Sequence, residues 1–377
     1  MNTTTNVAMS GYELAGDQLI ASDGYADQNT PLVTSCWYVA ARAQEVSREL
    51  LSRRILGTEV AIYRTLAGHP VAVRNRCPHR SFPLAKGKLN GDVLVCGYHG
   101  MQFDTSGRCV NMPSMPLVPS NANVRSYPVA ERGPLIWIWM GEPDLADEAA
   151  IPDTSWLVDP NFKSVTGGFS MKSDYVAMHE NLLDQTHFPF LHPGTVGTPE
   201  YARSKLDARE EGTQVVIDRV LKNSPPPGIY GVPAELMGKS VDRHSEARFI
   251  SPAMHVAFAR IVDPAPDEGR PGQYRFNITH LITPETNHSI HYWWFNSRDF
   301  KQTDVDADAF LYSASEQAYV EDVDALEWIS QVVQTDPVPQ FDLNFAPDKP
   351  GLFMRRIIHR LASSEASNRY SNLLRVK

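Results

Sequence analysis

Two short segments of this chain carry residue types that bind iron. They are Cys77-Pro-His79 and, after sixteen intervening residues, Cys96-Gly-Tyr-His99. Each segment offers one thiolate and one imidazole. In a Rieske-type [2Fe–2S] cluster two Cys hold one iron and two His hold the other, so each segment has to serve both irons. The spacing therefore predicts a [2Fe–2S] cluster held by these four residues.

Other sites for the same residue types have different patterns. A structural zinc site usually separates a pair of Cys from a pair of His, and a four-Cys cluster has no use for histidine. A structural zinc, or a loop pair without metal, remains the alternative.

A second group of polar residues lies in Asn181-Leu-Leu-Asp184-Gln-Thr-His187-Phe-Pro-Phe-Leu-His192. We predict a helix on which Asp184 and His187 share a face, with Asn181 one turn earlier. Pro189 would end this helix and let His192 return toward His187 from a loop. Two imidazoles and one carboxylate form the facial triad of non-haem Fe(II) oxygenases. The alternative is that both histidines are ordinary surface or core residues.

The carboxylate of such a triad has to come from elsewhere in the chain. Residues 306 to 334 have a long helical pattern, with an apolar stripe formed by Leu311, Ala318, Ala325, Leu326, Ile329 and Val333. Asp322 falls inside this stripe, where an unpaired carboxylate is costly unless it meets a cation. Glu321 lies on the shoulder of the stripe, and Asp324 should be solvated. The alternative for Asp322 is a cap or a pair with a nearby arginine.

The elements that position these residues fall into two groups. Residues 36–143 contain short apolar runs separated by turns, typical of a small all-β domain with the Cys/His segments in loops at its tip. We predict a lead-in at 1–35, a proline-rich linker at 144–160 and a second domain at 161–377. That domain should be α+β, an antiparallel sheet with helices on one face, and include a hairpin joined by Pro284–His288.

Composition excludes several classes of function. Charged residues make up 21% and hydrophobic residues 42% of the chain, as in globular proteins, and the net charge is −9. This charge argues against nucleic-acid and membrane-surface partners. No signal peptide or membrane helix is recognised, so we expect a cytoplasmic protein in which Cys36 and Cys109 need not be joined.

Taken together, these motifs resemble the oxygenase components of Rieske non-haem iron oxygenases, in the branch that includes the dicamba and vanillate O-demethylases. The resemblance runs from Cys36 to the helix with Asp322, and the segments that carry it include Cys36-Trp-Tyr-Val-Ala-Ala41, Cys96-Gly-Tyr-His-Gly-Met-Gln-Phe-Asp104, Leu135-Ile-Trp-Ile-Trp139 and Leu281-Ile-Thr-Pro-Glu-Thr286. It implies a catalytic domain with a helix-grip sheet. Ser81 and Met101 depart from residues that are common in relatives, and Phe82 and Tyr98 stand where respiratory Rieske proteins carry a disulfide pair.

The resemblance also implies roles for single residues. The ligands of the cluster would be Cys77, His79, Cys96 and His99, and those of a mononuclear Fe(II) would be His187, His192 and Asp322. Asp184 would link His187 to His99 of a neighbouring subunit in a head-to-tail homotrimer, and Asn181 would orient the iron site. Electrons would come from a separate ferredoxin and an NAD(P)H-dependent flavin reductase, since the chain has no nucleotide or plant-type ferredoxin motif.

The function that follows is O2-dependent dealkylation of a small aromatic ether or anilide, of which some herbicides are examples. Ring dihydroxylation or monohydroxylation is an alternative within the enzyme class, and an electron carrier with a ligand-binding domain is an alternative outside it. Phe276, Ile278, His280 and Ile282 alternate toward one face, so His280 could contact substrate in an apolar interior. His255 and Trp293 or Trp294 are weaker candidates, and no arginine on that face indicates a carboxylate clamp.

Overall fold

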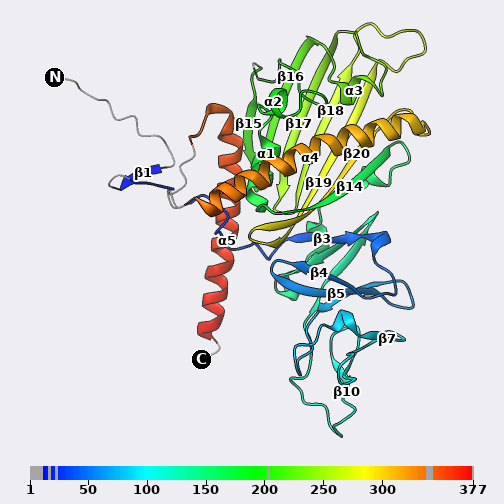
Figure 1. Cartoon of the computed structure of the whole chain (residues 1–377), viewed down its shortest axis with the longest axis vertical. Helices are drawn as coiled ribbons and strands as arrows, with labels where there is room; N and C mark the ends of the chain where they lie inside the picture. The colour runs from blue at the N-terminus through cyan, green and yellow to red at the C-terminus, as the bar shows by residue number, and fades with distance from the viewer. Residues whose placement is uncertain (1–11, 16–17, 22–23, 203, 337–342, 376–377) are drawn as a thin grey trace, which may run out of the picture.

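Figure 1 shows the computed structural model of the chain, which describes residues 12–15, 18–21, 24–202, 204–336 and 343–375. Two bodies of structure follow one another along its long axis. A set of small sheets, coloured blue to cyan, lies at one end, and one large sheet, coloured green to yellow, lies at the other. The described helices include none with both the length and the apolar character needed to cross a bilayer.

The N-terminal body is built from three small antiparallel sheets, which confirms the predicted all-β domain. The first sheet has the order β12-β13-β3, the second β11-β6-β5-β4 and the third β10-β9-β8-β7. Their strands are β3 (Trp37–Arg42), β4 (Leu51–Ile55), β5 (Thr58–Arg64), β6 (Pro70–Arg74), β7 (Lys88–Asn90), β8 (Val93–Val95), β9 (Gln102–Phe103), β10 (Cys109–Asn111), β11 (Ser126–Tyr127), β12 (Val129–Arg132) and β13 (Leu135–Trp139). A separate hairpin, β1 (Tyr12–Ala15) and β2 (Gln18–Ala21), precedes them.

The segment that follows β13 contains only short 3-10 turns before the large sheet begins. These turns are Pro143–Leu145, Glu148–Ala150 and Ser155–Leu157. Proline has no amide hydrogen, so the prolines in this stretch interrupt regular hydrogen bonding between strands. The predicted linker at 144–160 and the other domain limits stay a prediction.

The C-terminal body is a seven-stranded antiparallel sheet with helices packed on one face, so the predicted α+β fold is confirmed. Its order is β14-β20-β19-β18-β17-β16-β15. The strands are β14 (Lys163–Met171), β15 (Asp207–Glu211), β16 (Gln214–Ser224), β17 (Val241–Ser251), β18 (Met254–Val262), β19 (Gln273–Thr286) and β20 (Ser289–Arg298). The helices are α1 (Tyr175–Leu183), α2 (Phe188–Leu191), α3 (Gly228–Gly231), α4 (Val305–Thr335) and α5 (Lys349–Arg375).

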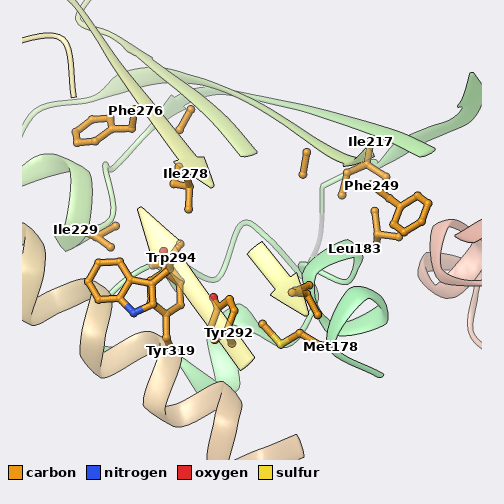
Figure 2. Close-up of a cluster of buried hydrophobic side chains, with 14 of the residues drawn as sticks. Met178, Leu183, Ile217, Ile229, Phe249, Phe276, Ile278, Tyr292, Trp294 and Tyr319 are labelled. Atoms are coloured by element: carbon orange, nitrogen blue, oxygen red, sulfur yellow. The ribbon is translucent and has the colours of Figure 1, made fainter. Parts of the chain in front are cut away.

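Strand alternation gives the large sheet two apolar faces. Tyr292 and Trp294 point to the helices, and Figure 2 shows them beside Tyr319 of α4 in the main core. Trp293 and Phe295 point the other way and pack with Trp137 and its neighbours in the N-terminal body. Because successive side chains in a strand alternate between faces, one run of aromatic residues joins both bodies. The two domains therefore share a buried interface.

The hairpin between β19 and β20 is tighter than predicted. Thr286 pairs with Ser289, which leaves only Asn287 and His288 as the connection instead of residues 284–288. Pro284 is accommodated within the strand at a register shift, where a missing amide hydrogen is tolerated. The carbonyl oxygen of Pro284 accepts a hydrogen bond from the backbone of Leu56, so the hairpin is fixed to the N-terminal domain.

Helix α4 confirms the long helix predicted for residues 306–334. It begins after Asp304, whose side chain accepts hydrogen bonds from the backbone of Asp306 and Ala307. Asp322 is buried and Asp324 is exposed, as predicted. Ile329 was expected in the apolar stripe but is 55% exposed, beside the exposed Trp328. The periodicity of the sequence defines a face of the helix, but burial also needs another element to cover that face.

Candidate metal sites and adjoining cavity

The two Cys/His segments form matching turns at the tip of the N-terminal domain. One turn follows β6 and is closed by the backbone bonds Cys77 N to Phe82 O and Ser81 N to Cys77 O. The other follows β8 and is closed by Cys96 N to Met101 O and Gly100 N to Cys96 O. Both thiols are buried and both imidazoles are exposed. A cluster held here would have its histidine side at the surface.

The positions of the ring nitrogens fit a shared metal ion. His79 Nδ1 and His99 Nδ1 lie 3.2 Å apart. Metal–nitrogen bonds of roughly 2.1 Å at a tetrahedral centre separate two ligand nitrogens by about 3.4 Å. Two thiols and two converging imidazoles are the donor set of a Rieske cluster, so the residues present fit that group.

The serine at position 81 and the aromatic pair Phe82 and Tyr98 have local explanations in these turns. Ser81 has a φ of 58°, in the left-handed region where glycine is the easiest residue to accommodate. Its hydroxyl accepts a hydrogen bond from Arg76 Nε, which favours serine at this position. Phe82 and Tyr98 lie side by side with ring centroids 5.7 Å apart. Here a ring contact stands in place of a disulfide between the two turns.

The segment after α1 differs from the predicted helix. Helix α1 ends at Leu183, so Asp184 and His187 do not share a helical face. The Asp184 carboxylate accepts hydrogen bonds from the backbone and the hydroxyl of Thr186. This Asx turn competes with helical hydrogen bonding and explains the early end. Pro189 lies in the first turn of α2, where proline is tolerated, rather than ending α1.

The structure nevertheless brings His187, His192 and Asp322 together. One potential ligand atom from each residue lies within 4.8 Å of the others. His192 Nε2 is 3.0 Å and His187 Nε2 is 3.6 Å from Asp322 Oδ1. His187 Nε2 is buried and has no hydrogen-bond partner among the described residues. A nitrogen in this position, facing a carboxylate and a second imidazole, fits a metal ion with open coordination positions.

Each imidazole of this group is held at its other nitrogen by a carboxylate. His187 Nδ1 is 3.4 Å from Asp184 Oδ2, and His192 Nδ1 is 2.7 Å from Glu321 Oε2. Such contacts fix the tautomer and orientation of histidines that bind metals. The sequence placed Glu321 only at the edge of the stripe on α4 and gave it no role. Its position next to Asp322 was the available signal.

A third contact orients the carboxylate itself. Asn181 Nδ2 donates a 2.9 Å hydrogen bond to Asp322 Oδ1, across from α1 to α4. Asn181 was predicted to orient this site, and the contact gives that prediction a physical basis. The alternative partner for Asp322, an arginine, is replaced by two histidines and an amide.

The electrostatics of the group favour a bound cation. Burial lowers the pKa of His187, but the hydrogen bond with Asp184 and the close negative charge of Asp322 outweigh it and raise that pKa to about 9. Burial raises the pKa of Asp322, and its contacts with the two histidines reverse this effect and lower it. Carboxylates that attract a proton to this place would attract a metal ion to the same place.

A cavity of about 90 Å³ adjoins the group on the helix side of the sheet. Its lining includes His192, Asp322, His280, His255, Tyr201 and Tyr319. His280 Nδ1 is 2.7 Å from the Tyr292 hydroxyl, and burial lowers the pKa of His280 to about 3, so its ring is neutral. The ring of Trp294 packs 5.1 Å from that of Tyr319 and supports the wall of the cavity from behind. Roles of His280, His255 and Trp294 toward substrate stay a prediction.

The sequence analysis missed two arginines that face this interior. Arg219 on β16 and Arg243 on β17 are 3% and 1% exposed. Arg219 follows Ile217 by two residues, and Arg243 precedes Phe249 by six. Because side chains alternate along a strand, each arginine points to the same face of the sheet as that core residue. The available signal was a charged residue at an apolar position of each strand, but the predicted substrate face comprised only residues 276–282 of another strand.

Comparison with known proteins adds two family matches. Residues 36–128 match the Rieske [2Fe-2S] domain, and residues 171–364 match the vanillate O-demethylase oxygenase C-terminal domain. The first range contains both Cys/His segments, and the second contains His187, His192 and Asp322.

Individual relatives cover most of the chain. The dicamba O-demethylase oxygenase component of Stenotrophomonas maltophilia is 35% identical over 349 residues, which are 89% of this chain and 99% of the relative. The iron-sulfur subunit of a toluene-4-sulfonate monooxygenase system from Comamonas testosteroni is 34% identical over 81% of this chain and 90% of its own length. A crystal structure of dicamba monooxygenase bound to 3,6-dichlorosalicylic acid superposes with a TM-score of 0.83 at 32% identity, covering 89% and 99% of the two chains.

Proposed function

This chain belongs to the Rieske oxygenases with a vanillate O-demethylase-type C-terminal domain, and from that premise we propose that it removes an alkyl group from a small aromatic ether or anilide. It is an oxygenase component of the monooxygenase type, with a Rieske cluster and a non-haem iron. The observation that carries the proposal is the convergence of His187, His192 and Asp322 beside an apolar cavity.

The cofactors define what the protein residues have to do. When bound, the cluster supplies single electrons and the iron activates dioxygen. Cys77, His79, Cys96 and His99 would hold the cluster, and His187, His192 and Asp322 would hold the iron. Asp184, Glu321 and Asn181 keep the three iron ligands in one orientation through the contacts described above. The apolar side chains that line the cavity, among them Val196, Ile229 and Ile278, exclude water from the reacting carbon.

We further propose that the working unit is a head-to-tail homotrimer. The turns around Cys77 and Cys96, called here the cluster loops, lie at one end of the molecule (Figure 1). Helices α1 and α2, which adjoin His187 and His192 in the sequence, belong to the other domain. His79, Tyr98 and His99 are exposed at the tip, and Asp184 is partly exposed on the iron side. Asp184 of one subunit would therefore receive His99 of the neighbour and connect it to His187. A separate ferredoxin and NAD(P)H-dependent flavin reductase would supply electrons, and the cytoplasmic location stays a prediction.

Dealkylation and ring hydroxylation give different products from the same substrate. Hydroxylation of the carbon attached to oxygen or nitrogen gives a hemiacetal or hemiaminal, which collapses to an aldehyde and the dealkylated arene. Ring attack yields a phenol or a cis-diol and no aldehyde. A screen of methoxy- and N-alkyl-arenes with ferredoxin, reductase and NAD(P)H should therefore yield aldehyde in amounts equal to the dealkylated product.

The outcome of this screen decides between the alternatives. Ring-hydroxylated products without aldehyde would reject dealkylation. A protein with a redox-active cluster but no mononuclear iron would be an electron carrier. Iron and sulfide analysis separates that case, since the oxygenase requires about three irons and about two sulfides per chain.

A further inference from the structure

The segment that carries both candidate histidine ligands has little regular structure of its own. Residues 187–201, called here the ligand segment, contain the four-residue helix α2 and otherwise turns. The carbonyl oxygen of His192 accepts a 2.9 Å hydrogen bond from the backbone of Gly197. A Cβ atom at Gly197 would clash with the carbonyl oxygen of Phe188, so the chain folds back closely over α2. A segment made of turns depends on contacts with other elements to keep one conformation.

Two buried arginines on the sheet supply such contacts at the end of the ligand segment. Arg219 Nη1 on β16 donates a 2.8 Å hydrogen bond to the carbonyl oxygen of Tyr201. Arg243 Nη2 on β17 donates to Thr198 Oγ1 at 2.9 Å and lies 3.8 Å from Glu200 Oε2. Side chains from two paired strands therefore hold the last turn of the ligand segment.

These contacts are made by groups that are costly to bury. Arg219 and Arg243 are 3% and 1% exposed, and a buried guanidinium needs acceptors and negative charge nearby. The sheet contributes the Ser224 hydroxyl, which accepts a 3.0 Å bond from Arg243 Nε. Burial lowers the pKa of Arg219, and the negative charge of Asp184 opposes this lowering. Glu200 provides negative charge near Arg243. The arginines and residues 184–201 therefore stabilise one another.

The ring of Tyr201 carries this contact to the histidines. The carbons of both guanidinium groups lie close to the centroid of this ring, at 5.2 and 5.0 Å. The centroid of the Phe188 ring is 5.2 Å from that of Tyr201. Phe188 in turn lies 4.9 Å from the ring of His187 and 5.8 Å from the ring of His192. Because closely packed rings do not shift independently, the position of Tyr201 limits where both imidazoles can lie.

We propose that Arg219 and Arg243 are positioning residues of the iron site. They fix the end of the ligand segment, and through the rings of Tyr201 and Phe188 they hold both imidazoles in place before a metal binds. The inference rests on the proposed function, in which the two histidines of this segment are iron ligands. Arginine suits this role because its planar group can donate hydrogen bonds and lie against an aromatic ring at the same time.

Metal affinity in the absence of substrate tests this inference. The protein with its cluster intact is depleted of mononuclear metal and titrated anaerobically with Co(II) in competition with a chelator. Arg219→Gln should lower the affinity for Co(II) about tenfold, at the lower end of the 10- to 100-fold range for groups that orient metal ligands. Arg260→Gln alters an exposed arginine of the adjacent strand β18 and serves as the matched control, which should bind Co(II) as the wild type does.

A second pair of variants leaves both arginines in place and decides the matter if Arg219→Gln does not fold. Thr198→Val keeps the size of the side chain but removes the acceptor for Arg243 Nη2, so the affinity for Co(II) should fall about threefold. Thr198→Ser keeps the hydroxyl and should bind Co(II) as the wild type does. The absorption of bound Co(II), which reports its coordination geometry, should change in Thr198→Val and in Arg219→Gln. The visible spectrum of the cluster, which belongs to the other domain, should not change.

Several results would overturn the inference. It is rejected if Thr198→Val binds Co(II) as tightly as the wild type, or if Thr198→Ser loses as much affinity as Thr198→Val. Lower urea midpoints with an unchanged Co(II) spectrum would show that the arginines stabilise the fold without positioning the histidines.

Failure of the inference can be told apart from failure of the proposed function. If the wild type binds no more Co(II) than His187→Ala does, the iron site is wrong and the inference fails with it. The expected losses of affinity, together with no aldehyde from any methoxyarene, would support the positioning role and reject dealkylation alone.

Discussion

Glu321 gives the sharpest test of how the iron site is built. Its carboxylate accepts a 2.7 Å hydrogen bond from His192 Nδ1, and His192 is only 1% exposed. Removing a carboxylate that orients a metal-bound histidine typically lowers metal affinity 10- to 100-fold, or about 1.4 to 2.7 kcal/mol. The Glu321 side chain is 27% exposed, so solvent screens part of this contribution. We therefore expect Glu321→Ala to lower Fe(II) affinity about tenfold.

The measurement is a competition between the protein and a chelator for Fe(II) or Co(II), without substrate or electron donor. Glu321→Gln keeps an oxygen that can accept the bond and should lose less affinity than Glu321→Ala. Asp324→Asn removes the same charge from an exposed position on the same helix and serves as the matched control. If Glu321→Ala binds metal as tightly as Asp324→Asn does, Glu321 has no role in orienting His192.

Three further predictions concern other contacts of the structure. Asp184→Asn should still load both metals when they are supplied in excess, because the amide oxygen can accept the bond from His187, but it should lose turnover because the charged link between His187 and the neighbouring cluster is broken; wild-type activity would remove Asp184 from that link. Burial lowers the pKa of His179 to about 4, although a hydrogen bond to the Pro252 carbonyl opposes this. Because the pKa of His179 in the folded protein is below the unfolded value of about 6.5, the unfolded chain takes up a proton first as the pH falls. The stability that the buried neutral imidazole contributes is therefore present above about pH 6.5. The free energy of unfolding decreases by about 3 kcal/mol as the pH falls to 4. Urea midpoints should fall more steeply over this range for the wild type and the exposed-site control His69→Gln than for His179→Gln, and parallel curves would contradict the assignment. Phe276→Ala should lower the free energy of unfolding by about 3–5 kcal/mol, against less than about 0.5 kcal/mol for the exposed Val220→Ala, as measured by urea denaturation; similar losses would be inconsistent with the core in Figure 2.

The features that the sequence predicted best are those encoded locally. The turns around Cys77 and Cys96 follow from residue type and short spacing, and helix α4 follows from a periodicity sustained over many residues. Asp322 could be found because a carboxylate in an apolar stripe is unfavourable without a partner. These patterns need no knowledge of distant contacts.

The features that the sequence did not predict depend on competition or on distant neighbours. Helix α1 ends early because Asp184 bonds to Thr186, a local alternative of similar strength to one more helical turn. The contact between Glu321 and His192 joins residues 129 positions apart and depends on how α2 turns back toward α4. Ile329 is exposed because no described element covers that part of α4. The contacts of Arg219 and Arg243 with the Tyr201 ring join residues on different segments of the chain, so the sequence alone does not predict them.

We propose that the cluster and the mononuclear iron act together to remove an alkyl carbon with dioxygen. The cluster ligands would be Cys77, His79, Cys96 and His99, and the iron ligands would be His187, His192 and Asp322. The most direct measurement is a single turnover with the reduced, fully loaded protein, a methoxyarene substrate and O2, in which cluster oxidation and aldehyde are followed together. The account predicts about one aldehyde per mononuclear iron, with oxidation of the cluster in the wild type and neither event at an appreciable rate in Asp184→Asn. Cluster oxidation without aldehyde, or aldehyde formation that is unchanged in Asp184→Asn, would contradict it.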